Sequence, residues 1–472
     1  TSASTPRGKG KKTALEGGDD AASSTGKGGK ATRKKKPVDV EEEDPMKPKP
    51  KPKPAEAEAE EEDPMPRGRA KKRADSGDAS QEEEVEEESP KPKLAARTHS
   101  DIFSRTSMEI ATYGDTDHVF VFSPTVALSV ERPTEGWSFS GRYLVDMVSA
   151  ASVDIVSTAT QHWTETRHAG SLNGQYKPHD FGIAASASIS REPDYLSLSG
   201  GAAILYDFNG KNDTMTLGYG YGRDSVGRHF TNYDIFSGVL KHNAFTAGLT
   251  FVINRTTVGS LSLDGVFESG DESKPYRYVP MFSSTVSAAM HPGASIDVVN
   301  QLRLPERPAE QLPTERKRYA ATLRLAHRYD SSTLRFEERL YDDDWGIKAS
   351  TTDLRYMIDL SRRVTFWPHF RAHIQTGASF WQLAYVSNRT AGNIATQGDW
   401  SVPAIRTGDR ELSQLWTGTT GLGIQWAIGG TEHPSSWVLS MNGDLMYTSY
   451  ADALYILYRT GGFFSFGLEA EL

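Results

Sequence analysis

Apolar and polar residues alternate along Phe366–Phe380, FWPHFRAHIQTGASF. Even positions are mostly apolar, with Phe at both ends, whereas odd positions include His369, Arg371, His373 and Gln375. A period of two is typical of a β-strand with one apolar and one polar face. At ~3.3 Å per residue the stretch would extend roughly 46 Å, well beyond a globular strand of about 5–6 residues. The pattern therefore predicts a strand that crosses a membrane, with an aromatic side chain at each interface.

The same alternation recurs throughout the chain after residue 100, for example in Phe245–Ile253 and Phe464–Leu472. Sixteen such segments are found, at 104–113, 117–130, 136–148, 164–177, 179–191, 195–208, 211–223, 242–254, 257–269, 316–330, 332–342, 346–361, 364–384, 411–428, 436–450 and 460–472. An even number of strands suits closure of a bacterial single-chain barrel. The sequence therefore predicts an all-β fold, namely a transmembrane antiparallel up-and-down β-barrel of about 16 strands.

Two kinds of connector alternate between these segments. Short turns such as KPH, NGK and SRR stand at every second junction, and long connectors, among them 148–163, 224–241, 271–315 and 385–410, fall at the others. In outer-membrane barrels the short turns face the periplasm and the long loops face outward. The alternation predicts a barrel in the bacterial (Gram-negative) outer membrane, with the residues before the first strand in the periplasm.

Residues 1–100 differ in composition from the predicted barrel region, residues 101–472. They contain no Phe, Trp or Tyr, and their 22 Lys and Arg residues balance 22 Asp and Glu residues. Such a segment cannot bury enough apolar surface to offset the entropy of ordering, so we expect a disordered periplasmic tail. Its Lys-Pro run, 47–54, favours extended polyproline II and could reach peptidoglycan or a partner protein. The equally dense acidic blocks argue against nucleic-acid binding.

The composition also limits the available chemistry. The chain has no cysteine, which excludes disulfides, thiolate metal sites and covalent haem attachment within it. No apolar run approaches the ~18 residues of a membrane helix. Because the sequence opens at Thr1 rather than Met, we expect that an export signal was removed, although trimming of the chain would look the same.

Charged residues recur on the predicted inner face of four neighbouring strands. By parity these residues are Arg318, Arg324, Arg328, Arg335, Glu337, Arg339, Asp353, Arg355, Asp359, Arg371 and His373. Cross-strand neighbours on one face lie about 5 Å apart, so arginines and carboxylates can pair. Two compatible interpretations follow: a salt-bridge network that stiffens one wall, or an eyelet that orients charged solutes. Glu338 has lipid-facing parity, which indicates either a position near an interface or a local β-bulge.

A near-repeat, VDMVSAAS followed by VDIVSTAT, occupies residues 145–160. Parity places Arg142 and Asp146 in the lumen near the outer end of a strand, and the second copy continues into an extracellular loop. In an extended chain Asp154 would lie ~26 Å beyond Asp146, too far for both carboxylates to bind one ion. We therefore expect Asp154 in a loop that folds back over the pore, and Asp146 to influence ion selectivity.

Several stretches of the barrel region resemble a known family. They are YLVDMVSAASVDIVSTAT at 143–160, PERP at 305–308, YDDDWGI at 341–347 and FWPHFRAHIQTGASFW at 366–381. They resemble the bacterial domain-of-unknown-function 3570 family, whose members are presumed outer-membrane β-barrels. The resemblance covers about residues 100–472. It implies the same fold and offers no activity, cofactor or catalytic residue to transfer.

Three further patterns have both a chemical and a structural interpretation. His369 and His373 have zinc-like helical spacing, but on a strand they lie ~13 Å apart, which favours two separate polar lumen residues. Asp342, Asp343 and Asp344 suit either a calcium site at the outer rim or a tight acidic turn, of which we favour the turn. A Ser-His-Asp set is not excluded by spacing, but no GxSxG motif is present, so we do not expect an enzyme.

These observations favour a pore or transport channel for small solutes with an Arg/Asp-lined lumen. The alternative is a barrel scaffold in a multi-protein outer-membrane complex for export or electron transfer, since the connector 271–315 is longer than a simple rim requires. An outer-membrane hydrolase ranks third. We expect contact with outer-membrane lipid and no bound metal or cofactor.

Overall fold

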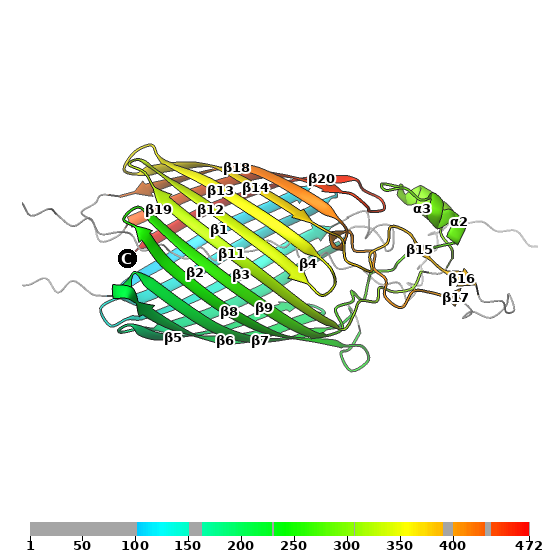
Figure 1. Cartoon of the computed structure of the whole chain (residues 1–472), viewed down its shortest axis with the longest axis horizontal. Coiled ribbons are helices and arrows are strands. Elements are labelled where there is room, and N and C mark those ends of the chain that lie inside the picture. The colour runs from blue at the N-terminus through cyan, green and yellow to red at the C-terminus, as the bar shows by residue number, and fades with distance from the viewer. Residues whose placement is uncertain are drawn as a thin grey trace, which may run out of the picture. The chain divides into compact units, whose positions relative to one another are not determined.

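Sixteen strands pair antiparallel in chain order and close into one barrel, because the last strand also pairs with the first (Figure 1). This computed structural model describes residues 102–150, 163–228, 231–305, 307–389, 400–429 and 436–471. The barrel strands are β1 (Phe103–Asp115), β2 (Val119–Arg132), β3 (Trp137–Ala150), β4 (Trp163–Tyr176), β5 (Phe181–Glu192), β6 (Tyr195–Phe208), β7 (Asp213–Val226), β8 (Gly238–Asn254), β9 (Thr257–Gly270), β11 (Glu315–Arg328), β12 (Ser332–Asp343), β13 (Lys348–Asp359), β14 (Val364–Gln375), β18 (Leu415–Ile428), β19 (Ser436–Tyr450) and β20 (Tyr458–Glu471). The predicted sixteen-stranded barrel is confirmed. The predicted tail, residues 1–100, lies outside the described residues.

The largest difference from the predicted strand limits is at β14, which ends at Gln375 and not at residue 384. Beyond this point the backbone leaves the barrel, and the amide of Ser379 donates to the carbonyl of Trp345 at 2.7 Å. Phe380 then packs edge-on against Trp345, with ring centroids 5.4 Å apart. The strand predicted over Phe366–Phe380 is therefore confirmed as far as Gln375, and its predicted extension to Phe380 was wrong. Alternation continued by chance into residues that no longer pair with neighbouring strands.

The outer surface of the barrel is apolar. On β6, for example, Leu198, Ile204 and Tyr206 are exposed large hydrophobic residues and occupy alternate positions. This arrangement reverses that of a soluble protein, and it is stable only where lipid surrounds the barrel. The helices in the described part of the chain lack the length and apolar character needed to cross a bilayer.

Two long connectors form a folded unit at one end of the barrel. One contains β10 (Met281–Phe282), α2 (Ser284–Ala289) and α3 (Ile296–Leu302); the other contains β15 (Tyr385–Val386), β16 (Asn388–Arg389), β17 (Trp400–Ser401) and η2 (Arg410–Leu412). Strand β10 pairs parallel with β15 and so joins them. We call the described residues of 271–314, 376–414 and 451–457 the cap. Figure 1 shows α2, α3 and β15 to β17 beyond the barrel end opposite the one where β20 finishes.

The cap has an apolar core of the kind found in soluble proteins. Phe282 is fully buried and packs with Ala294, Val299 and Ala384 from both long connectors. Burial of these side chains away from water holds the two connectors together at a gain of ~25 cal/mol per Å² of apolar surface. The cap is therefore folded by the ordinary hydrophobic effect, whereas the barrel exterior depends on lipid.

Truncating the centre of this core should loosen the cap and leave the barrel closed. We expect Phe282→Ala to destabilise the cap by about 3–5 kcal/mol, because the substitution leaves a cavity among buried side chains. Limited proteolysis should then cut the cap faster, while the heat-dependent gel mobility of the barrel is retained. Phe370→Ala, on the exposed outer face of β14, is the matched control. Equal cleavage of the cap in both variants would contradict the assignment.

Candidate functional site

The inner wall formed by β11 to β14 brings together the charged residues that parity predicted. One row crosses all four strands, because Arg324 is in register with Glu337, Glu337 with Asp353, and Asp353 with Arg371. Cross-strand partners share a face of the sheet. We call this row and its neighbours on the same face the ladder, and it comprises Arg318, Arg324, Arg328, Arg335, Glu337, Arg339, Asp353, Arg355, Asp359, Arg371 and His373.

Several ladder residues form ion pairs. Arg324 pairs with Glu337 on the next strand, and a guanidinium nitrogen of Arg328 lies 2.6 Å from a carboxylate oxygen of Asp359. Arg335 has no ion pair within 4.0 Å among the described residues. Arginines outnumber carboxylates in the ladder, so this wall carries a net positive charge.

Two carboxylates on different strands hold His369, which lies beside the ladder on β14. Its Nε2 is 2.8 Å from Asp353 of β13, and its Nδ1 is 2.8 Å from Asp444 of β19. A neutral imidazole carries one N–H, so only the protonated ring donates to both carboxylates at once. The bridge ties together β13, β14 and β19 across the intervening β18. Sequence reasoning placed His369 in the lumen but missed this central role and its partner Asp444.

Two glycines on β18 provide space for inward side chains of neighbouring strands. A Cβ placed on Gly421 would lie 1.7 Å from a carboxylate oxygen of Asp444, and one on Gly423 would lie 2.1 Å from the Trp367 ring. Asp444 can therefore reach His369 only because the residue between them in the register is glycine. Inward-facing glycines on a barrel strand were the one sequence signal that could have indicated a side chain crossing from a neighbour.

His373 belongs to a separate set of contacts. Its Nδ1 is 2.8 Å from the hydroxyl of Thr351, and its Nε2 is 3.3 Å from the amide oxygen of Gln375. The two histidines thus have different partners, in agreement with their interpretation as polar lumen residues.

Asp146 lies in the lumen on β3, where parity placed it. It is 7% exposed, accepts a hydrogen bond of 2.6 Å from Ser123 and forms an ion pair with Arg167 of β4. Arg142 is on the same inner face, two alternate positions earlier. Asp154 lies outside the described residues.

Glu338 faces outward without any shift in register. The pairing of β12 is continuous on both sides, which removes the β-bulge alternative. Its carboxylate accepts hydrogen bonds from Ser350 at 2.6 Å and Thr352 at 2.5 Å, both on β13. These hydroxyls offset part of the cost of a carboxyl group on the lipid-facing surface.

The acidic run covers the last two residues of β12, Asp342 and Asp343, and the first residue of the turn that follows, Asp344. Asp342 is 2.6 Å from Lys348, Asp343 is 2.7 Å from Arg316, and Asp344 accepts from the backbone amide of Lys317 at 2.9 Å. The three carboxylates thus point to different partners, and only Asp344 lies in the predicted turn. A different acidic group, Glu165, Glu192 and Asp194, gathers within 4.8 Å at the rim; this group was not identified from the sequence.

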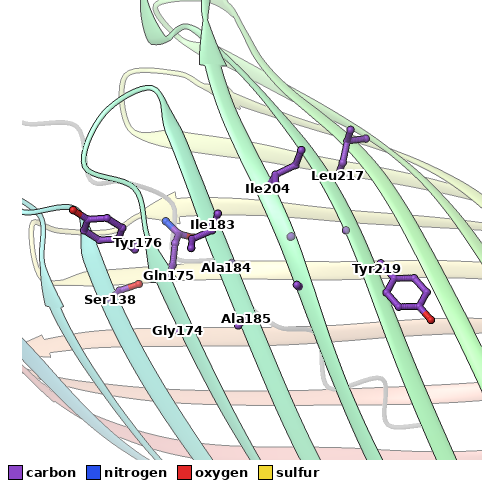
Figure 2. Close-up of a pocket in the computed structure, with 13 residues that line it drawn as sticks. Ser138, Gly174, Gln175, Tyr176, Ile183, Ala184, Ala185, Ile204, Leu217 and Tyr219 are labelled. Atoms are coloured by element: carbon purple, nitrogen blue, oxygen red, sulfur yellow. The ribbon is translucent and has the colours of Figure 1, made fainter.

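A hollow of about 800 Å³ lies in the wall where small residues follow one another on β4 to β7. Figure 2 shows Tyr176 and Tyr219 at its two sides. Several of the larger side chains that line it, namely Tyr176, Ile183, Ile204 and Tyr219, are exposed on the outer surface. The hollow therefore opens mainly toward lipid and is separate from the charged lumen.

A buried ion pair attaches the cap to the barrel rim. Arg410 of η2 pairs with Asp117 of the β1–β2 connector, and Asp117 is completely buried. Within the cap, Arg277 lies 2.8 Å from Asp409 and 3.1 Å from Glu310. Because an unpaired buried charge is costly, the Arg410–Asp117 pair favours one position of the cap on the rim, and the pairs of Arg277 hold the segments of the cap together.

Glu272 begins the cap next to the end of β9. Burial, followed by repulsion from Glu268, raises the pKa of Glu272 to about 7, although Arg316, Arg318 and Lys274 lower it. A guanidinium nitrogen of Arg316 lies 3.8 Å from a carboxylate oxygen of Glu272 and forms an ion pair with it. The junction between barrel and cap therefore contains a carboxyl group that titrates near neutral pH.

One family model matches more than half of this chain. Residues 157–438 match the family described as "Protein of unknown function (DUF3570)". No curated protein matches the chain. Among solved structures, the siderophore receptor PirA from Acinetobacter baumannii is 12% identical with a TM-score of 0.37, over 73% of this chain and 53% of that one. The chain thus spans about half the length of that receptor.

Two other solved structures match over nearly their whole length. A bacterial polysaccharide outer membrane secretin is 10% identical with a TM-score of 0.36, over 78% of this chain and 97% of that one. OccK5 (OpdH) from Pseudomonas aeruginosa is 10% identical with a TM-score of 0.34, over 79% of this chain and 98% of that one.

The raised pKa of Glu272 predicts the direction of a pH effect. A carboxyl with a raised pKa in the folded protein contributes stability below its ordinary pKa of 4.5, and this contribution is lost as pH rises through about 7. We expect Glu272→Gln to reduce the fall in Tm between about pH 5 and about pH 8. Glu315→Gln, at an exposed carboxyl on β11, is the control. The same pH dependence in wild type and Glu272→Gln would contradict the prediction.

Proposed function

The chain belongs to the DUF3570 family, whose description assigns no function, and we propose that this protein is an outer-membrane pore for small charged solutes. A barrel of sixteen strands is wide enough to leave an aqueous channel. The proposal involves transport only and no catalytic step.

The row Arg324–Glu337–Asp353–Arg371 is the observation that carries this proposal. Fixed charges on the wall of a narrow aqueous passage act on solutes more strongly than charges in bulk water, because low-dielectric walls focus their field. The positive excess of the ladder favours anions or solutes with an anionic group. Its ion pairs also hold the side chains in place, so the structural and selective roles are compatible.

The connectors support an orientation. Short turns lie at one end of the barrel, and the cap lies at the other. In bacterial outer membranes the short turns face the periplasm. The cap then lies on the cell surface at the pore mouth, and the residues before β1 extend into the periplasm, where peptidoglycan or a partner protein could contact them.

A second candidate is a scaffold role in a multi-protein complex. The cap is a folded unit with its own core, and its helix α3 exposes Val298 and Leu302, which are four residues apart and so lie on one side of the helix. Exposed apolar side chains on a folded surface favour contact with another protein. This role is compatible with a pore but does not require one.

Conductance in planar bilayers tests the pore. We expect the full-length protein to form channels with anion preference, and Arg142→Gln/Arg335→Gln to lower the anion-to-cation permeability ratio by roughly twofold, because two lumenal charges are removed. Arg362→Gln, at an exposed arginine in the β13–β14 turn, should leave the ratio unchanged. Absence of conductance from folded wild-type protein would overturn the pore.

Asp146→Asn tests the effect of removing a negative charge from the lumen. Removal of this lumenal carboxylate leaves the hydrogen bond from Ser123 possible and the charge of Arg167 unbalanced. The anion preference should therefore increase, again by roughly twofold. An unchanged permeability ratio would restrict Asp146 to a structural role.

A further inference from the structure

Basic side chains line the outer surface of the barrel near its cap end. Arg191 of β5, Arg223 of β7, Lys241 of β8 and Lys317 of β11 are all exposed and have the parity of the outward-facing apolar residues on their strands. Arg223 and Lys241 are direct cross-strand partners. We call these four residues the basic row.

Acidic side chains do not neutralise the basic row. Among the described residues, none of the four forms an ion pair within 4.0 Å. The neighbouring carboxylates Asp224 of β7 and Glu268 of β9 are buried on the inner side of the wall. By contrast, the outward-facing Lys348 on β13 is paired with Asp342 at 2.6 Å. Glu315 is an exposed acid on the same stretch of surface. Because the row has four cations, it keeps an excess of positive charge beside this carboxylate.

Aromatic rings lie directly below the basic row, toward the middle of the barrel. Tyr219 and Phe245 have ring centroids 5.1 Å apart, Phe245 and Phe267 5.9 Å, and Phe267 and Tyr319 6.0 Å. Aromatic belts mark the level of lipid headgroups. Because Arg223 is four residues beyond Tyr219 on β7, the cations lie up to ~13 Å farther out, at phosphate level.

Exposed apolar side chains follow the basic row toward the middle of the barrel. Ile189 lies two residues before Arg191 on β5, and Tyr221 lies two residues before Arg223 on β7. The hollow of Figure 2 is not part of this surface, because its lining residues Tyr176 and Ile183 lie next to the short turn at the opposite end of the barrel. Cations with apolar side chains below them on the same strands match the two parts of a phosphorylated lipid.

We infer that this side of the barrel binds a phosphorylated glycolipid of the surrounding leaflet, with phosphate on the basic row and acyl chains against the exposed apolar side chains below it. The inference needs only that the barrel is in a membrane, and it holds whether or not the lumen conducts. Long basic side chains can bury their apolar stems against the aromatic belt while their charges reach the phosphates. Electrostatic attraction and apolar burial then act on one ligand.

Native mass spectrometry of the full-length protein in detergent tests this site. The probes are bisphosphorylated lipid A and the same glycolipid with both phosphates removed. Wild-type protein should retain the phosphorylated lipid at least about tenfold more tightly, and Arg223→Gln/Lys241→Gln should lose most of that difference. Arg362→Gln/Arg363→Gln, in the turn at the opposite end, should behave as wild type.

Folding and alternative ligands are controlled separately. Heat-dependent gel mobility shows whether the double variant is folded; if it is not, Arg191→Gln/Lys317→Gln provides a second test of the same row. Equal retention of both lipids by wild type, or an undiminished preference in a folded variant, would overturn the inference. Complete displacement of the lipid by inorganic phosphate at about 10 mM would also overturn it, since the site would then bind free anions rather than lipid.

Discussion

Pairing of every backbone amide and carbonyl inside a membrane is the constraint on which the rest of this structure depends. Lipid offers no hydrogen-bond partner, so a sheet in a bilayer must close on itself. Here closure is the pairing of β1 with β20, in a continuous register from Arg105–Glu471 to Asp115–Gly461. Once the ring is closed, each strand has one face toward lipid and one toward the lumen. Alternation of apolar and polar residues follows from that geometry, and so does the possibility of a charged interior.

In the closed barrel, the inward-facing residues of neighbouring strands are brought together in the lumen. The charged rows on β11 to β14 arise because four neighbouring strands place their inward charges at matching register positions. Where side chains must reach farther, glycine removes the obstacle, as Gly421 does between His369 and Asp444. The same geometry operates outward: Glu338 is accepted on the lipid side because Ser350 and Thr352 on the next strand donate to it.

The cap and the outer surface follow different rules from the lumen. The cap is stabilised by burial of side chains such as Phe282 and by buried ion pairs such as Arg410–Asp117, as in a water-soluble domain. The outer surface is apolar around the barrel but carries unpaired cations on β5 to β11 near the cap end. One side of the barrel is thus chemically distinct from the other, which supports separate functions for the lumen, the cap and the lipid-facing wall.

Alternation along the chain was sufficient to identify sixteen strands, their inward and outward faces and the ladder, because these depend only on period and on pairing of consecutive strands. It failed at Phe380, where alternation continued after strand pairing had stopped. Alternation also could not predict contacts between distant segments. Asp444 contacts His369, which is 75 residues away in the sequence, and Asp117 contacts Arg410, which is 293 residues away. These contacts depend on how far a side chain reaches across the wall and on how the long connectors fold. Only the three-dimensional arrangement decides both.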